Sequence, residues 1–317
     1  MTLPFQKLPF LVMKSIFETM AFLDLFMLSC TSAKTKRIVK TVFKIRNHWL
    51  LVVVGEPLSL QIVSGTDENY KEEISFTSKN SIEWILNLVV HEFHLNIGAV
   101  ENVSSNYIEE KDDTFTLLTY WSDPKTGFNV FYDALFEVFG AKVGEVEIAV
   151  DEIPVKNYQK EIDWIENRFP PLATFRIIGR CSFQNYIWLM KNVRARNIVF
   201  FTLEPTEYPE NHEVVNLEME EIRITHGRWM KMQDIQAIKA RSIVIWDELD
   251  LEFYREADPG IVLEGLNAID VEPMSEDCLG QWSIELANGK KCTILYAEYE
   301  TNQPDIKHFV FEIRNED

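Results

Sequence analysis

The sequence predicts a mixed α/β protein, α+β overall, with three short N-terminal helices, a repeating βα region and a C-terminal antiparallel hairpin that caps it. Apolar residues recur at helical spacing near the N-terminus, and short β-type runs alternate with helical segments from residue 145 onward. Two further β-type runs near the C-terminus flank the turn sequence Asn288-Gly289. The expected parts are residues 1–45, 46–140, 141–275 and 276–317.

Charge is spread unevenly along the chain. The 317 residues carry 31 Lys and Arg against 50 Asp and Glu, a net charge of −19, whereas residues 1–50 alone carry +6 and leave −25 for the remainder. Two segments of opposite charge indicate two modules. An acidic surface offers no counterion release, so we expect neither nucleic acid nor an anionic membrane as a partner and favour a protein.

The cysteines and the N-terminal apolar run bear on the compartment. The four cysteines show no C-x-x-C spacing, so neither a zinc site nor a disulfide framework is indicated. Charged residues cut the N-terminal run into stretches far shorter than the roughly 20 apolar residues that a membrane span needs; they are Lys7, Lys14, Glu18 and Asp24. We expect an intracellular protein, cytoplasmic, nuclear or both.

The first forty residues carry too much apolar surface for one buried face. Met13, Ile16 and Phe17 fall on one helical stripe with Met20, whereas other apolar side chains point elsewhere around the same helix. Three helices are expected, with Pro9 in the first turn of one, Asp24 opening the next and Ser32 as the N-cap of the third. So small a bundle needs cover, either from the following region or from a partner.

The order of these residues resembles the F-box. The similarity rests on Leu8-Pro9, Val12-Met13, Ile16-Phe17, Met20, Asp24-Leu25, Leu28-Ser29 and the basic stretch from Lys34 to Val39. Three positions differ from the usual pattern. Phe10-Leu11 replace an acidic residue, Phe22 replaces a proline, and Thr35 replaces an aromatic residue. The layout as a whole resembles the nematode F-box family with a type 2 F-box-associated domain.

This resemblance implies a docking site for a Skp-type adaptor, which bridges to a cullin. The implied adaptor-binding residues are Leu8, Pro9, Val12, Met13, Ile16, Phe17, Met20, Leu25 and Leu28.

Beyond the third helix, strand-like patterns dominate. The pattern predicts a hairpin of residues 49–54 and 58–63 around Gly55-Glu56-Pro57. A helix is expected to begin at Ser81 and to include Phe93. Residues 115–121 read as a strand and 128–139 as a helix. Six β-type runs then begin 29, 23, 24, 21 and 25 residues apart, at residues 146–150, 175–178, 198–202, 222–225, 243–246 and 268–271.

That period is typical of leucine-rich-repeat-like solenoids, although their consensus is missing. A doubly wound α/β sheet is the structural alternative. The C-terminal cap would be a hairpin of residues 282–286 and 292–299, with a third strand at 308–313.

Catalytic patterns are weak. His91 and His94 lie in H-E-F-H, one residue short of a zinc-binding H-E-x-x-H, and we interpret them as an ordinary helix surface. Phosphate-binding glycine loops and a nucleophile elbow have no match in the sequence, and no cysteine has a neighbouring histidine. Acidic clusters are interpreted as solvated faces: Glu218, Glu220 and Glu221, and Asp247, Glu248, Asp250 and Glu252. We expect no catalytic residue, metal or cofactor, and no enzyme.

These observations predict a substrate receptor of an SCF-type cullin-RING ubiquitin ligase. Its helices would dock on the adaptor, its C-terminal domain would hold a protein target, and it would accelerate ubiquitination by proximity alone. The alternative is a free-standing protein-binding scaffold with an F-box-like helical cap. The target is not readable from the sequence.

Overall fold

The structure is a computed structural model that divides into two compact units, Met1–Val146 and Glu147–Asp317. It describes residues 8–43, 48–64, 71–78, 92–109, 115–169, 172–207, 212–227, 230, 234, 237–248, 269–270, 278–285, 291–297 and 308–315.

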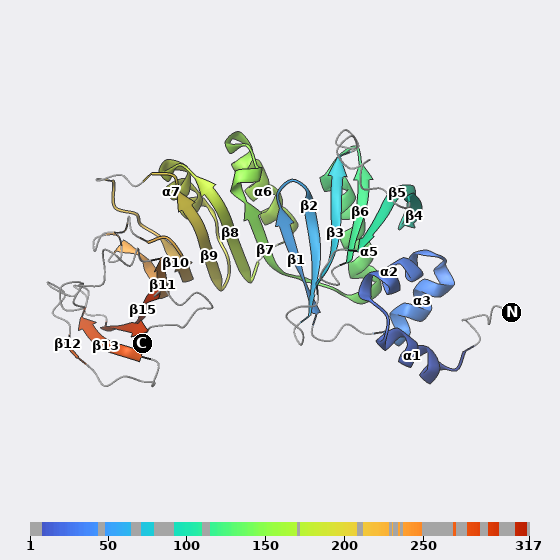
Figure 1. The fold of residues 1–317 in the computed structure, drawn as a ribbon, viewed down its shortest axis with the longest axis horizontal. Coiled ribbons are helices and arrows are strands. Elements are labelled where there is room, and N and C mark those ends of the chain that lie inside the picture. The colour runs from blue at the N-terminus through green and yellow to red at the C-terminus, as the bar shows by residue number, and fades with distance from the viewer. Residues whose placement is uncertain are drawn as a thin grey trace. The chain divides into compact units, whose positions relative to one another are not determined.

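Three helices open the first unit (Figure 1): α1 (Phe10–Glu18), α2 (Phe22–Cys30) and α3 (Ala33–Val42). All three helices predicted from the sequence are confirmed. Pro9 and Ser32 are the N-caps of α1 and α3, and the Ser32 hydroxyl accepts the Thr35 N–H at 3.1 Å. Asp24 lies in the first turn of α2, where a carboxylate is favoured by the helix dipole.

Six neighbouring strands of a larger sheet follow in the first unit. They are β1 (His48–Val54), β2 (Leu58–Ser64), β3 (Lys71–Ser78), β4 (Glu92–Ile97), β5 (Val100–Glu109) and β6 (Phe115–Trp121), in the order β1-β2-β3-β6-β5-β4. The β3–β6 pair is parallel and the others are antiparallel. The β1–β2 hairpin is confirmed. The predicted helix at Ser81 lies outside the described residues, but Phe93 belongs to β4, so the expectation of helix there was wrong.

Helix α5 (Pro124–Phe139) packs on one face of this sheet. Asp123 caps its start, and Gly140 ends it with a φ of 68°, a left-handed conformation that glycine adopts without steric cost. The ring of Phe76 on β3 lies 5.5 Å from that of Phe128 and 5.4 Å from that of Phe131. These rings form the centre of the first unit's core.

The second unit begins with alternating strands and helices and continues as strands from β9 onward. β7 (Val143–Ala149) crosses the boundary between the units and is followed by the short 3₁₀ turns η3 (Val150–Glu152) and η4 (Val155–Asn157), then by α6 (Tyr158–Arg168). After them come β8 (Thr174–Cys181), α7 (Phe183–Asn192), β9 (Ile198–Pro205), β10 (Glu218–Ile224) and β11 (Lys239–Glu248). One side of β8–β10 is buried, and Phe201 meets Tyr186 of α7 at 6.3 Å.

The strands β8, β9, β10 and β11 lie side by side in chain order and pair in parallel. The run ends there, because β12 (Ile269–Asp270) pairs antiparallel with β13 (Cys278–Glu285) and not with β11. The sixth parallel strand expected near residue 269 was therefore wrong. Parallel pairing thus runs from β8 to β11, and β7 lies next to β8 in the strand order, so the solenoid prediction stays open.

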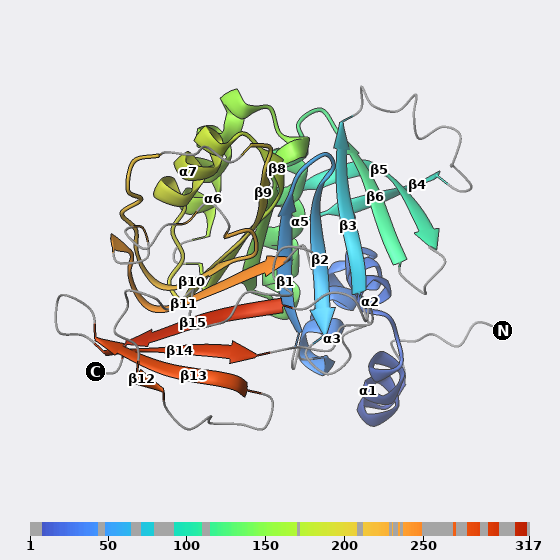
Figure 2. The ribbon, with the colours of Figure 1, turned by 60° about the vertical axis from the view of Figure 1, so that its left-hand side comes forward.

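The C-terminal strands continue the sheet (Figure 2). β13 pairs antiparallel with β14 (Lys291–Ala297), and β14 with β15 (His308–Asn315), so the third strand is found where the sequence placed it. β15 also pairs antiparallel with β11, from Ser242↔Arg314 to Glu248↔His308. These strands thus extend a mixed sheet by edge pairing, and a separate cap stays a prediction.

Candidate partner-binding surface

Helix α1 leaves three of its six apolar side chains exposed. Phe10 is 51% exposed, Leu11 76% and Val12 43%, and these three residues are called the α1 patch below. Only Phe17 of the helix is fully buried. Consecutive helical residues point in different directions, so these three side chains expose apolar surface on several sides of the first turn, and such surface is the kind that a protein partner covers.

Helix α2 does the opposite, because its own chain covers it. Phe22, Leu23, Leu25 and Phe26 are at most 2% exposed. The Phe22 ring lies 4.5 Å from that of Phe139, and the Phe26 ring lies 5.6 Å from that of Phe131, so both pack against α5. The apolar face of α2 is therefore buried by the region that follows the helices in the chain.

A buried carboxylate joins α2 to the sheet. Both oxygens of Glu72, on β3, accept backbone N–H groups from the first turn of α2: Phe22 at 2.7 Å and Leu23 at 2.5 Å. Glu72 is fully buried, and this burial raises the pKa of its carboxyl group to about 7 despite the two hydrogen bonds, which lower the pKa. Sequence reasoning missed Glu72. A signal existed, since strand alternation puts it on the same face as Ile74 and Phe76.

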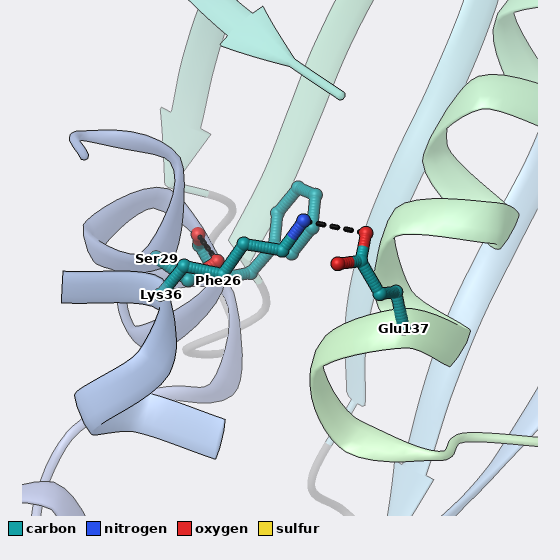
Figure 3. Close-up of polar contacts among 4 residues, drawn as sticks. All are labelled: Phe26, Ser29, Lys36 and Glu137. Atoms are coloured by element: carbon teal, nitrogen blue, oxygen red, sulfur yellow. Dashed lines mark hydrogen bonds and ion pairs between the residues drawn. The ribbon is translucent and has the colours of Figure 1, made fainter. Parts of the chain in front are cut away.

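Helix α3 rests on the same core with one face. Val39 and Val42 are buried, whereas Lys34, Arg37 and Lys40 are exposed. Figure 3 shows the ion pair that links this helix to α5, between Lys36 Nζ and Glu137 Oε2 at 2.5 Å. The same view shows Ser29 Oγ donating to the Phe26 carbonyl at 2.6 Å, within α2.

The residues that the F-box resemblance implies for adaptor binding separate into three groups. Pro9 and Val12 are exposed, and Phe17 and Leu25 lie in the chain's own core. The half-buried ones are Leu8, Met13, Ile16, Met20 and Leu28. The structure thus gathers Leu8 to Met13 at an accessible surface that also holds Phe10 and Leu11, two of the residues that depart from the family pattern.

No metal-binding constellation forms within the described ranges. His94 and Glu92 lie in β4, a strand, and not on the predicted helix surface; His91 falls outside these ranges. No group of three His, Cys, Asp or Glu side chains there could hold a metal ion. Burial raises the pKa of the Cys30 thiol, and it raises that of Cys181 to about 11, which keeps both protonated near neutral pH.

The described members of the acidic clusters lie on two strands. Glu218 and Glu220 are exposed on β10, and Glu221 bonds to Arg223 at 2.8 Å. Asp247 and Glu248 end β11, while Asp250 and Glu252 lie outside the described residues. Among the helices that the structure describes, none is both long and apolar enough to cross a membrane.

In this small helical segment one helix lies in the core of its own unit and another leaves apolar side chains exposed. Comparison with known families shows that residues 5–47 match the F-box domain. The N-terminal helices are thus an F-box domain, and residues 48–317 lie outside the match. Searches of curated proteins and of solved structures found no match for this chain.

Proposed function

We propose that this protein is a substrate receptor of an SCF-type cullin-RING ubiquitin ligase, docked on a Skp-type adaptor through its F-box. The observation that carries the proposal is the exposed α1 patch on a detected F-box domain. F-box domains bind Skp-type adaptors, and the patch is apolar surface that this unit does not cover.

The patch is large enough to matter energetically. Apolar side chains contribute about 25 cal/mol for each Å² removed from water, so burying Phe10, Leu11 and Val12 in a partner would contribute several kcal/mol. In place of the acidic residue usual in the family, Phe10 and Leu11 supply apolar contact. We expect adaptor binding to depend on these two side chains more than on Phe17 or Leu25, which are already buried.

For the remainder of the chain, the proposal is a platform that holds a protein target and supplies proximity without catalysis. The parallel run β8–β11 supports a leucine-rich-repeat-like platform, and the layout supports the nematode family with a type 2 F-box-associated domain. The exposed Glu218 and Glu220 on β10 favour basic targets, since charge steers encounter. The proposed site of action is intracellular, in the cytoplasm, the nucleus or both.

The test is co-purification with a Skp-type adaptor. Leu11→Asp places a charge on the most exposed residue of the patch, and we expect it to lower adaptor recovery at least tenfold with no loss of folding. Val155→Asp is the matched control, because it makes a similar change at a residue that is 55% exposed in the other unit. Equal recovery of the two variants would overturn the docking surface.

The second candidate is a free-standing scaffold whose helices close the core of the first unit. It is favoured by the burial of Phe22, Leu23, Leu25 and Phe26 against the chain itself. A scaffold needs no adaptor, so failure of the unmodified chain to bind any Skp-type adaptor would decide for it.

A further inference from the structure

Glu72 occupies a position that packing alone does not explain. It stands on the apolar face of β3, where Ile74 and Phe76 are at most 1% exposed, and it is itself fully buried. A buried carboxylate is costly unless hydrogen bonds satisfy it. Its neighbour Glu73 points to the other face and meets Gln61 Nε2 and Ser75 Oγ, each at 2.9 Å.

The atoms that satisfy Glu72 are the first two backbone N–H groups of α2. The initial N–H groups of a helix have no partner within the helix, and α2 has no side-chain cap of its own at Ala21. The Glu72 side chain therefore caps the N-terminus of α2 from a strand that is distant in sequence. The cap specifies direction as well as energy, because both carboxylate oxygens are used and the first turn must point at β3.

The orientation of α2 decides which F-box surface remains for a partner. With its first turn bonded to Glu72, α2 directs Phe22 and Phe26 to α5. Helix α3 packs on α2, and α1 on α3, so the place of α1 follows from that of α2.

From this geometry we infer that Glu72 is a positioning residue for adaptor binding: it fixes α2 on the sheet so that α1, and not α2, presents the docking surface. The inference rests on the proposed function. Glu72 itself does not contact the adaptor. Without the Glu72 side chain, the F-box helices would be free to shift on the core. Adaptor binding would then have to order these helices, which would weaken the affinity.

Within the described residues, Asp24 in the first turn of α2 acts on Glu72 as a like charge. The register neighbours of Glu72 are uncharged, Ile62 on β2 and Phe115 on β6. From β1, the His48 ring stacks on the Phe22 ring, with the ring centroids 6.3 Å apart.

The experiment compares the unmodified chain with Glu72→Gln and Glu73→Gln, each as the full chain. Glutamine keeps the shape but offers only one acceptor oxygen to the two N–H groups. We expect Glu72→Gln to bind a purified Skp-type adaptor about tenfold more weakly, at a temperature where it is fully folded. Glu73→Gln should bind as the unmodified chain does. If Glu72→Gln fails to fold, Glu72→Asp, which keeps the charge but is too short to reach, takes its place.

A spectroscopic measurement separates positioning from stability alone. The amide signals of Phe22 and Leu23 should shift with pH with a midpoint near 7 in the unmodified chain, where the pKa of Glu72 is about 7. The shift should vanish in Glu72→Gln. Lost amide shifts with unchanged adaptor affinity would make Glu72 a stabilising cap only and overturn the inference. An unmodified chain that binds no adaptor would instead overturn the proposed function.

Discussion

Helices α1 and α2 are both nine residues long and both largely apolar, yet they end in opposite environments. α1 buries Phe17 alone, whereas α2 buries Phe22, Leu23, Leu25, Phe26 and Ser29. Composition therefore does not decide which helix joins the core. Long-range partners do, namely the rings of Phe131 and Phe139 on α5 and the carboxylate of Glu72 on β3.

The difference assigns separate tasks to two neighbouring helices. α2 ties the F-box to the sheet of its own unit, and α1 stays available to a partner. A chain beginning near residue 46 would lose the rings of Phe22 and Phe26 and leave Phe139 and Phe131 without them. We therefore expect such a truncation to destabilise the first unit. Removal of an F-box that did not pack on the sheet would leave the stability of that unit unchanged.

The largest expected effect contrasts the two helices directly. Phe26→Ala removes a fully buried ring that meets Phe131, so we expect it to lower the free energy of unfolding by about 3–5 kcal/mol. Leu11→Ala, at a residue 76% exposed, should change it by less than about 0.5 kcal/mol. Urea unfolding measures both. Similar losses for the two variants would erase the distinction between core helix and docking helix.

The second prediction sharpens the role of the Glu72 cap through pH. Its pKa rises from 4.5 in the unfolded chain to about 7 in the folded one, so the unfolded chain releases this proton first as pH increases. The stability linked to Glu72 is fully present below pH 4.5 and is lost as pH rises through 7, by up to about 1.4 kcal/mol per pH unit.

Stability should therefore fall across this window in the unmodified chain, and it should fall less steeply in Glu72→Gln. The measurement is the midpoint of chemical unfolding at a series of pH values, with Glu73→Gln as the control. Parallel pH profiles for all three proteins would refute the linkage.

The smallest effect concerns the surface contact between α3 and α5. Lys36→Ala breaks the ion pair between the Lys36 side chain, which is 29% exposed, and the Glu137 side chain, which is 56% exposed. We expect the free energy of unfolding to fall by less than about 1 kcal/mol, and by less still as salt is added. Lys40→Ala makes the same change on the exposed side of α3. A loss of several kcal/mol for Lys36→Ala alone would mean that this pair, and not the α2 rings, holds the F-box in place.

Local patterns were sufficient for most elements. Helical spacing and the Ser32 cap located the three N-terminal helices, and the Gly55-Glu56-Pro57 turn located the β1–β2 hairpin. The chain-order parallel pairing of β8–β11 was predicted from the regular spacing of the β-type runs, which is typical of stacked repeats. Long-range pairing was not accessible in this way. That β12 joins β13 and not β11, and that Phe17 and Leu25 are buried, depend on partners that no local pattern names.

The same limit applied to the candidate site. The F-box residue order located the three helices, but which of them is buried depends on contacts such as that of Phe22 with Phe139, which are far apart in the sequence. The Glu72 cap was missed because a carboxylate on a strand is ordinarily interpreted as solvated, and only the three-dimensional approach of α2 gives it partners.

We propose that α1 presents the docking surface, whereas α2 belongs to the core of its unit. Amide hydrogen exchange on the full chain, with and without a purified Skp-type adaptor, tests it most directly. We predict that the adaptor slows exchange in Phe10–Glu18, whereas Phe22–Cys30 is already slow in the free chain and changes little. Adaptor-dependent protection confined to α2, or exchange in free α2 as fast as in α1, would contradict the account.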